Sequence, residues 1–359
     1  MRTDLFPLLK TRYTQLGGLR LVRQYAKMGL LWPAAKTILR HPFSKQTYKQ
    51  VYLDTVRKVE PMLVKEYRPV MKEIAERISP PSTGSGTGST TAQLEHKRSK
   101  IIWFCWLQGI ENAPEVVKAC YHSLTRHLGV AGRGSTGSPI ARNEGYEIIV
   151  IDGKNWREYV ELPDYIIRRR EKKQIPPAHF SDLLRLELLI KYGGTWIDST
   201  VLCTGVNNDN DNVNYLDTDL FMFQYTQPGS SEWGGIGNWF ITACTNNEVL
   251  MVLREMLLAY WKDYDCVLDY YIFHLFFSML REVFPKEIGA MPYAYAPRSL
   301  ALVHHWGEPF DETKWKRLTE RVCFHKLTYM KDKVPEKVEG TYYEYILNAN
   351  ANDNYNYNE

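Results

Sequence analysis

The sequence predicts an α/β protein in which a mostly parallel central sheet is flanked by helices, with a helical extension at the N-terminus. Two apolar, β-type runs at residues 100–107 and 146–152 enclose a helical stretch at 115–128. Strand, helix and strand in that order are typical of a parallel pair. A third apolar run, 195–203, directly follows a helical segment at 180–191. The composition, 44% hydrophobic and 24% charged, is that of a folded protein and excludes a disordered or collagen-like chain.

The N-terminal region is predicted to be helical, because apolar residues such as Val59, Leu63 and Tyr67 recur at helical spacing. Pro61 is expected to interrupt this pattern. A stretch rich in Pro, Gly, Ser and Thr follows and has the composition of a flexible linker. The predicted organisation is a basic helical extension at 1–79, a linker at 80–98, a main domain at 99–332 and a partly disordered tail at 333–359.

The remaining elements follow from the same periodicities. They are helices at 156–160, 165–173, 246–262 and 267–281, and a strand at 220–225. The helix at 180–191 is apolar on most of its surface, and Gly193 and Gly194 are expected to end it.

The charge is distributed unevenly along the chain. Residues 1–50 hold ten Lys or Arg and one acid, so the rest of the chain is mildly acidic. Such a basic arm is suited to peripheral contact with an anionic membrane, although a solvated helix face explains it equally well. No nucleic-acid-binding motif accompanies it, so nucleic acid is not an expected partner. No apolar run approaches the roughly 18 residues that span a bilayer.

The cysteines favour a cytoplasmic location. The six cysteines form no CxxC pair and no compact disulfide spacing. We therefore expect reduced thiols in a cytoplasmic protein, with the basic arm as the candidate for peripheral attachment to the membrane.

The most informative stretch runs from His179 to Thr200. Asp182 and Arg185 are three residues apart on a predicted helix and so share a face. A charged pair on a buried helix must either satisfy itself or face a polar cleft. A structural ion pair is the simpler reading of this pair alone.

Asp198 follows Gly193 and Gly194, which allow a tight turn between helix and strand. A carboxylate near the carboxyl end of a strand in an open α/β sheet lies where such folds bind ligands, although a cap or turn residue is the alternative.

The whole string, S-D-x-x-R-x-x-x-L-x-x-x-G-G-x-W-x-D-x-T over 181–200, resembles the signature of GT-A-fold glycosyltransferases with a DXD-type motif. That clan includes glycosyltransferase family 32 and the clostridial glucosylating toxins. More closely, the chain resembles the capsular polysaccharide synthesis protein family, with further likeness at 102–109, 238–241, 269–274 and 325–328. The resemblance implies a Rossmann-like GT-A sheet. It also implies metal-dependent transfer of a sugar from a nucleotide-sugar donor, a UDP-sugar, to a glycan or lipid-linked acceptor, with retention.

The resemblance also implies roles for single residues. Trp106 stands where the clan stacks an aromatic ring on the base, and a core tryptophan is the alternative. Asp182 and Arg185 match the pair that binds the donor sugar and steadies the diphosphate. Asp198 matches the first metal-binding Asp, for Mn²⁺ or Mg²⁺. Thr200 stands where the wider clan has a second Asp, which leaves one fewer carboxylate for an ion that wants about six oxygens.

Four further residues are weaker candidates. A late His or Lys often returns to the metal and diphosphate in such enzymes, which assigns His325 to the metal and Lys326 to the nucleotide sugar. Asn238 and Asp269 are candidates for the acceptor side, although Asn238 follows a glycine and fits a turn.

Two other functions stay open. Thr200 in place of Asp favours a non-catalytic module that binds a nucleotide or glycan. A sugar-phosphate transferase would use the same diphosphate site and release a nucleoside monophosphate.

Overall fold

The computed structural model describes residues 17–32, 45–80, 95–129, 145–205, 214–226, 235–330, 333–336 and 338–350, with the backbone alone for 45–54. Most of the predicted linker and the last nine residues lie outside this part. The chain divides into two compact units. The helical unit comprises Met1–Thr90, Glu161–Leu186 and Glu248–Pro285, and the sheet unit comprises Thr91–Val160, Glu187–Asn247 and Lys286–Glu359.

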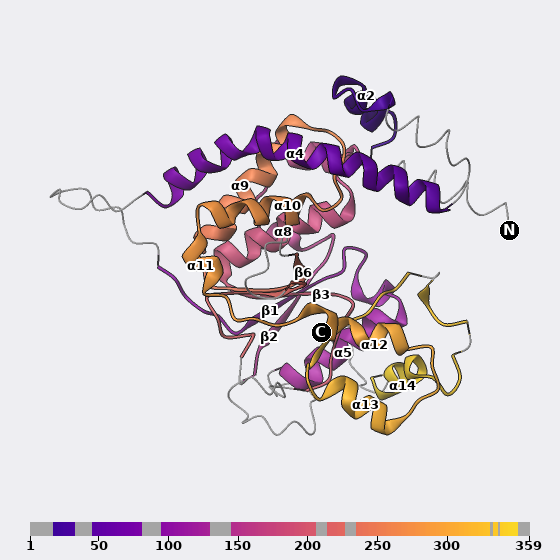
Figure 1. Cartoon of the computed structure of the whole chain (residues 1–359). Helices are drawn as coiled ribbons and strands as arrows, with labels where there is room; N and C mark the ends of the chain where they lie inside the picture. Colours follow the sequence, from indigo (N-terminus) through magenta and orange to yellow (C-terminus); the bar gives the residue numbers. More distant parts are fainter. Residues whose placement is uncertain are drawn as a thin grey trace. The chain divides into compact units, whose positions relative to one another are not determined.

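A five-stranded sheet forms the centre of the sheet unit (Figure 1). Its strands are β1 (Ile101–Cys105), β2 (Glu147–Ile151), β3 (Gly194–Asp198), β5 (Leu220–Gln224) and β6 (Ile236–Ala243), in the order β2-β1-β3-β6-β5. β1 pairs in parallel with β2 and β3, whereas β6 runs antiparallel to both β3 and β5. The α/β prediction with a mostly parallel sheet is therefore confirmed.

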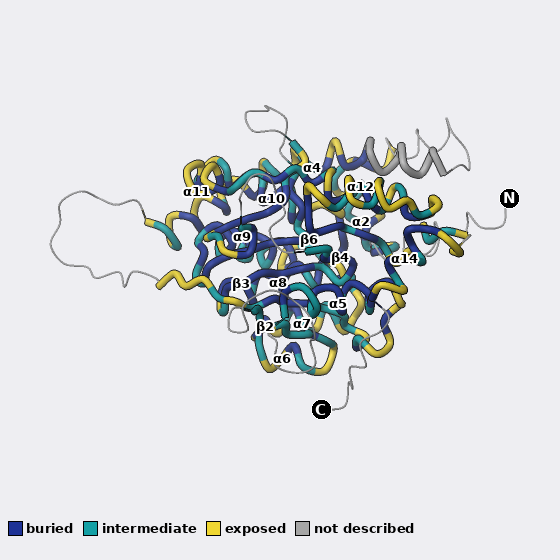
Figure 2. The backbone as a smooth tube through the Cα atoms, turned by 90° about the horizontal axis from the view of Figure 1, so that it is seen from below, coloured by how far each residue is buried: buried dark blue, intermediate teal, exposed yellow. Residues whose placement is uncertain are grey.

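The sheet unit has a core on one face of this sheet. Ile102 and Phe104 of β1 point into it, together with apolar residues of three helices, α5 (Glu115–Leu128), α12 (Ala296–His305) and α14 (Tyr342–Ala349). Trp103, between them, points to the opposite face, where its indole donates to the Gly193 carbonyl at 2.9 Å. The tube in Figure 2 is dark blue along β3 and β6, which shows how completely these central strands are buried.

The structure corrects two strand predictions. The run at 195–203 is two strands, because the chain turns at Ser199 and Thr200 and then forms β4 (Val201–Cys203). β4 pairs antiparallel with β7 (Phe324–Lys326) in a separate two-stranded sheet. β6 is the second difference, since the sequence pattern did not identify 236–243 as a strand.

The smaller helices of the sheet unit lie in its connections. They are η1 (Ile110–Asn112), α6 (Trp156–Tyr159) and α13 (Glu312–Thr319). α11 (Pro285–Gly289) begins at the last residue of the helical unit. α14 falls within the predicted tail and contributes to the core, because Tyr342 and Ile346 are buried.

The helical unit is built around a long helix, α4 (Lys45–Ile78), which packs on α9 (Glu248–Asp263) and α10 (Ile272–Met279). Its other elements are α2 (Leu19–Lys27), α7 (Asp164–Glu171) and η2 (Leu280–Glu282). Val59, Leu63 and Tyr67 of α4 are buried as the spacing predicted. The helix continues through Pro61, contrary to the prediction, and this proline lies on the exposed face.

α8 (Pro177–Tyr192) carries the central motif, and the division between the units falls within it. Residues up to Leu186 belong to the helical unit, and Glu187 onward belong to the sheet unit. In the described part of the chain, no helix has both the length and the hydropathy needed to cross a membrane.

Candidate active site

The carboxyl ends of β1 and β3 bring two predicted residues to one edge of the sheet. In the β1–β3 register, Cys105 pairs with Asp198. Trp106 is the next residue of the chain and therefore lies just beyond the end of β1, at the edge where β3 also ends. β6 runs the other way, and Ile197 pairs with Phe240. Asn238, two residues before Phe240, therefore lies at this same edge. An edge formed by strand ends is where open α/β sheets bind ligands.

Two glycines connect α8 to β3, as the sequence indicated. Gly193 and Gly194 have φ values of 69° and 91°, a region that other residues rarely adopt. A Cβ on Gly194 would lie 2.4 Å from the Ile101 carbonyl oxygen. Only glycine lets β3 begin this close to β1, and that approach sets where β3 ends at Asp198.

The carboxylate of Asp198 is held on both oxygens. The Trp196 indole N–H donates to Oδ1 at 2.9 Å, and the Lys326 ammonium donates to Oδ2 at 2.8 Å. Lys326 also donates to the Thr200 hydroxyl at 2.7 Å. The structure thus brings together three predicted site residues, Asp198, Thr200 and Lys326.

His325 lies elsewhere. Successive residues of a strand point to opposite faces, so His325 points away from the side on which Lys326 reaches Asp198. Its ring is fully buried, and Nε2 lies 3.2 Å from the Thr204 hydroxyl. Burial lowers the pKa of His325 to about 4, so the ring is neutral at pH 7. The structure does not bring His325 to Asp198.

The residues around Asp198 do not fit a divalent ion as they are arranged. Asp198 supplies one carboxylate and Thr200 one hydroxyl, and Lys326 already donates to both. Nowhere in the described ranges do three or more His, Cys, Asp or Glu side chains form a group that could hold a metal. Mg²⁺ keeps near-octahedral oxygen coordination and usually relies on carboxylates. The requirement for Mn²⁺ or Mg²⁺ stays a prediction.

Trp106 presents an aromatic edge at the same end of the sheet. Its ring meets the Tyr329 ring edge-on, with centroids 5.1 Å apart. Trp106 is half-buried against the core, whereas Tyr329 is 47% exposed. The sequence did not single out Tyr329. Its position three residues after Lys326 would have been the signal for it.

The helical unit holds the other predicted pair. Arg185 Nη1 lies 3.0 Å from Asp182 Oδ1, and both side chains are buried, at 5% and 9% exposed. Arg185 also donates to the Ser181 hydroxyl at 3.3 Å. The two opposite charges pair across one helical turn, which offsets part of the cost of burying them.

His179 extends this buried polar group by one turn. Its ring lies edge-on to Trp261 and Tyr270, and Nδ1 is 4.0 Å from Asp182 Oδ2. Burial first, and then the charge of Arg185, lower the pKa of His179 to about 4. His179 is therefore neutral at pH 7 and adds no charge to the pair.

Asp269, the predicted acceptor residue, is fully buried in the helical unit. It accepts a hydrogen bond from the Tyr271 backbone N–H at 2.9 Å, immediately before α10. Burial and the nearby Asp269 charge raise the pKa of Glu60. Asp182, Arg185 and Asp269 thus belong to the helical unit, and the other predicted residues belong to the sheet unit.

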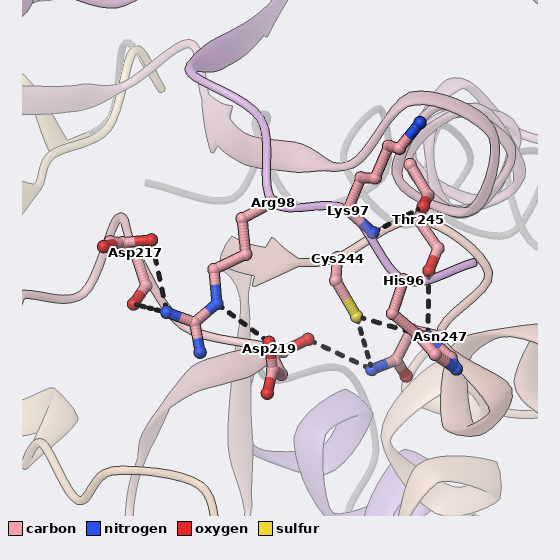
Figure 3. Close-up of polar contacts among 8 residues, drawn as sticks. All are labelled: His96, Lys97, Arg98, Asp217, Asp219, Cys244, Thr245 and Asn247. Carbon is pink, nitrogen blue, oxygen red and sulfur yellow. Dashed lines mark hydrogen bonds and ion pairs between the residues drawn. The ribbon is translucent and has the colours of Figure 1, made fainter.

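A second polar group in the sheet unit lies at the opposite edge, where β1 begins and β6 ends (Figure 3). Arg98 donates to Asp219 at 2.8 Å, and Cys244 Sγ lies 3.7 Å from His96 Nδ1. Burial raises the pKa of the Cys244 thiol, which makes it a poor nucleophile and a poor metal ligand. These contacts fasten the segment before β1 to the start of β5 and the end of β6.

Comparisons with known proteins address the function. No curated protein matches the sequence. A solved structure titled "PaToxG Glycosyltransferase" is similar over 73% of this chain and 93% of that chain, with 13% identity and a TM-score of 0.36. The family model described as capsular polysaccharide synthesis protein matches residues 83–346. That match spans most of the chain and includes the whole of the 181–200 motif. It shows that the chain belongs to the capsular polysaccharide synthesis protein family, as the motifs predicted.

Proposed function

We propose that this protein is a glycosyltransferase that moves a sugar from a UDP-sugar donor to a hydroxyl group of a glycan or lipid-linked acceptor in polysaccharide or capsule synthesis, with retention. The observation that carries the proposal is the pairing of Asp198 with Lys326 at the carboxyl edge of the parallel strands, the edge at which Trp106 follows β1. An aromatic ring and a cation at one end of the sheet suit the flat base and the charged diphosphate of a nucleoside diphosphate.

The chemistry requires positive charge at the leaving group. Sugar transfer breaks the bond between the anomeric carbon and the diphosphate oxygen and leaves the electron pair on the diphosphate. Lys326 is the cation that we assign to this negative charge, because a fixed charge in a site that is partly shielded from water stabilises it strongly. We assign Asp198 to holding the Lys326 ammonium and Asn238 to the acceptor side. For Asp182 and Arg185, contacts with the donor sugar and the diphosphate are what the family resemblance implies.

The experiment is a donor screen with the purified full chain. A panel of UDP-sugars, with and without Mn²⁺ or Mg²⁺, is assayed for release of nucleoside diphosphate and for a glycosylated product by mass spectrometry. Asp198→Asn should lower turnover by about 100-fold or more, which is the scale for losing one charge-stabilising group. Asp164→Asn is the matched control, because Asp164 is 88% exposed at the start of α7.

Each possible result has a defined meaning. Equal background rates in the wild type and in Asp198→Asn would remove the proposed activity. Binding without turnover would indicate a nucleotide- or glycan-binding module, and release of a nucleoside monophosphate would indicate a sugar-phosphate transferase. The anomeric configuration of the product, read by NMR, tests retention.

We also propose that the segment 19–32, which contains α2, holds the enzyme against an anionic membrane. Leu19 is 81% exposed and Trp32 is 72% exposed, and Arg23 and Lys27 lie on the surface of the same segment. Apolar side chains beside basic ones suit the interface of an anionic bilayer. The full chain should sediment with vesicles containing phosphatidylserine but not with neutral phosphatidylcholine vesicles. Equal sedimentation of the wild type and Trp32→Ser would contradict this role.

A further inference from the structure

Lys326 places a positive charge between the two residues that the family resemblance assigns to a metal ion. Its ammonium nitrogen is 2.8 Å from Asp198 Oδ2 and 2.7 Å from Thr200 Oγ1. These are hydrogen-bond distances to both oxygens. The cation at this carboxylate is therefore one that the chain itself supplies.

The backbone fixes the ammonium there. Lys326 pairs with Val201 in the β4–β7 register, and the Leu327 N–H donates to the Thr200 carbonyl at 2.7 Å. Hydrogen bonds on both sides of Lys326 hold its strand against the turn that carries Thr200. The side chains of Lys326 and Asp198 are only 22% and 26% exposed, so this pair differs from a mobile ion pair on the surface.

A divalent ion would have to displace this arrangement. The Trp196 indole already occupies the other oxygen of Asp198. Removing Lys326 from Oδ2 would leave a partly buried ammonium without its carboxylate, and separating a partly buried pair is costly. Thr200, in place of a second carboxylate, offers a neutral oxygen that accepts equally well from an ammonium group.

We propose that the Lys326 ammonium replaces the divalent cation in this enzyme, so that it binds the donor diphosphate and supports sugar transfer without a metal ion. The inference rests on the proposed function. An ammonium group has three N–H donors. Two are used on Asp198 and Thr200, and the third can donate to a phosphate oxygen.

In the transfer step, Lys326 acts only through its charge and forms or breaks no covalent bond. The acceptor oxygen forms a bond to the anomeric carbon as the bond from that carbon to the diphosphate oxygen breaks. The electron pair stays on the diphosphate, which takes up the acceptor's hydroxyl proton. Lys326 remains an ammonium throughout and stabilises the developing charge.

The first test measures binding rather than turnover. UDP is titrated into the full chain by calorimetry, once in excess EDTA and once in Mn²⁺. The wild type should bind UDP in EDTA, with an affinity that Mn²⁺ changes less than about threefold. Lys326→Met should weaken UDP binding by about tenfold or more in both conditions, and Lys326→Arg should restore much of it because it keeps the charge.

The control is Lys316→Met, at an exposed lysine of α13 that pairs only with the exposed Glu312 among the described residues. It should bind UDP as the wild type does. Circular dichroism and thermal melting of Lys326→Met identify any loss of folding, and the Lys326→Arg variant keeps the test decisive if the Met variant unfolds.

The second test is turnover of the best donor in EDTA. The wild type should retain activity, and Lys326→Met should lose it by about 100-fold without rescue by Mn²⁺. UDP binding or turnover that appears only with Mn²⁺ would overturn the lysine inference and leave the proposed function standing. A chain that binds no UDP and turns over no donor, with or without Mn²⁺, would instead overturn the proposed function, and the lysine inference with it.

Discussion

Gly194→Ala is a sharp test of how the turn before β3 positions the site. Gly194 has a φ of 91°, and a Cβ there would lie 2.4 Å from the Ile101 carbonyl oxygen, which is a backbone atom. Gly194 also opens the strand that ends at Asp198. A methyl group at this position therefore acts on the β1–β3 pairing and, through it, on the edge that holds the carboxylate.

The cost of this substitution has two parts. A residue with a side chain at positive φ costs about 1–2 kcal/mol. Relieving a 2.4 Å contact requires the strands to move by about 1 Å, because ordinary contacts begin near 3.4 Å, and such overpacking costs about 1–3 kcal/mol. We expect Gly194→Ala to lower the free energy of unfolding by about 2–5 kcal/mol.

The assay is urea unfolding of the full chain, followed by tryptophan fluorescence, with UDP-sugar turnover measured alongside. Gly289→Ala is the matched control, because a Cβ at that exposed position of α11 meets nothing within 4 Å. It should change stability by less than about 1 kcal/mol. If Gly194→Ala unfolds at the same urea concentration as the wild type, the reasoning from φ and close approach is wrong.

Three further predictions follow from the buried groups and from Trp106. Arg185→Met leaves the Asp182 carboxylate buried without its guanidinium partner and should destabilise the protein by about 3–5 kcal/mol in urea unfolding, whereas Arg185→Met combined with Asp182→Leu should recover much of this loss. His179 has a pKa of about 4 in the folded protein, whereas the ordinary value is 6.5. Its contribution to the free energy of unfolding is therefore present above pH 6.5 and is lost as the pH falls toward 4. His179→Gln should flatten this part of the stability profile by up to about 3 kcal/mol, and an unchanged slope would contradict it. Trp106→Ala should weaken UDP binding by about tenfold or more in calorimetry, through lost base stacking, while Trp106→Phe should retain most of the affinity; equal affinities would remove the stacking role.

Local pattern was enough to predict most of the elements. Apolar runs at 100–107 and 146–152 became β1 and β2, and the stretch at 115–128 became α5 with the predicted bounds. These elements follow from periodicity within a single segment, which the sequence displays directly. β6 escaped prediction because Gly237, Asn238 and Thr242 interrupt its apolar run, so that it shows neither a continuous apolar stretch nor a regular alternation.

The candidate site also has one part that local sequence predicts and one part that it does not. Asp182 and Arg185 could be paired from their spacing alone, because residues three apart on a helix face the same side. The turn at Gly193 and Gly194 could also be predicted from adjacent residues. The partner of Asp198 could not, because Lys326 lies 128 residues farther along the chain. The β4–β7 register, and not any motif, decides that Lys326 reaches the carboxylate while His325 turns away.

By itself, the sequence determined the strand–helix–strand order, the family and the residue types available for binding a diphosphate, because short-range spacing and a contiguous motif encode all three. Only the tertiary structure decided which cation meets Asp198. A pairing between distant strands fixes that choice, and a shift of one residue would have presented a neutral imidazole instead of an ammonium group.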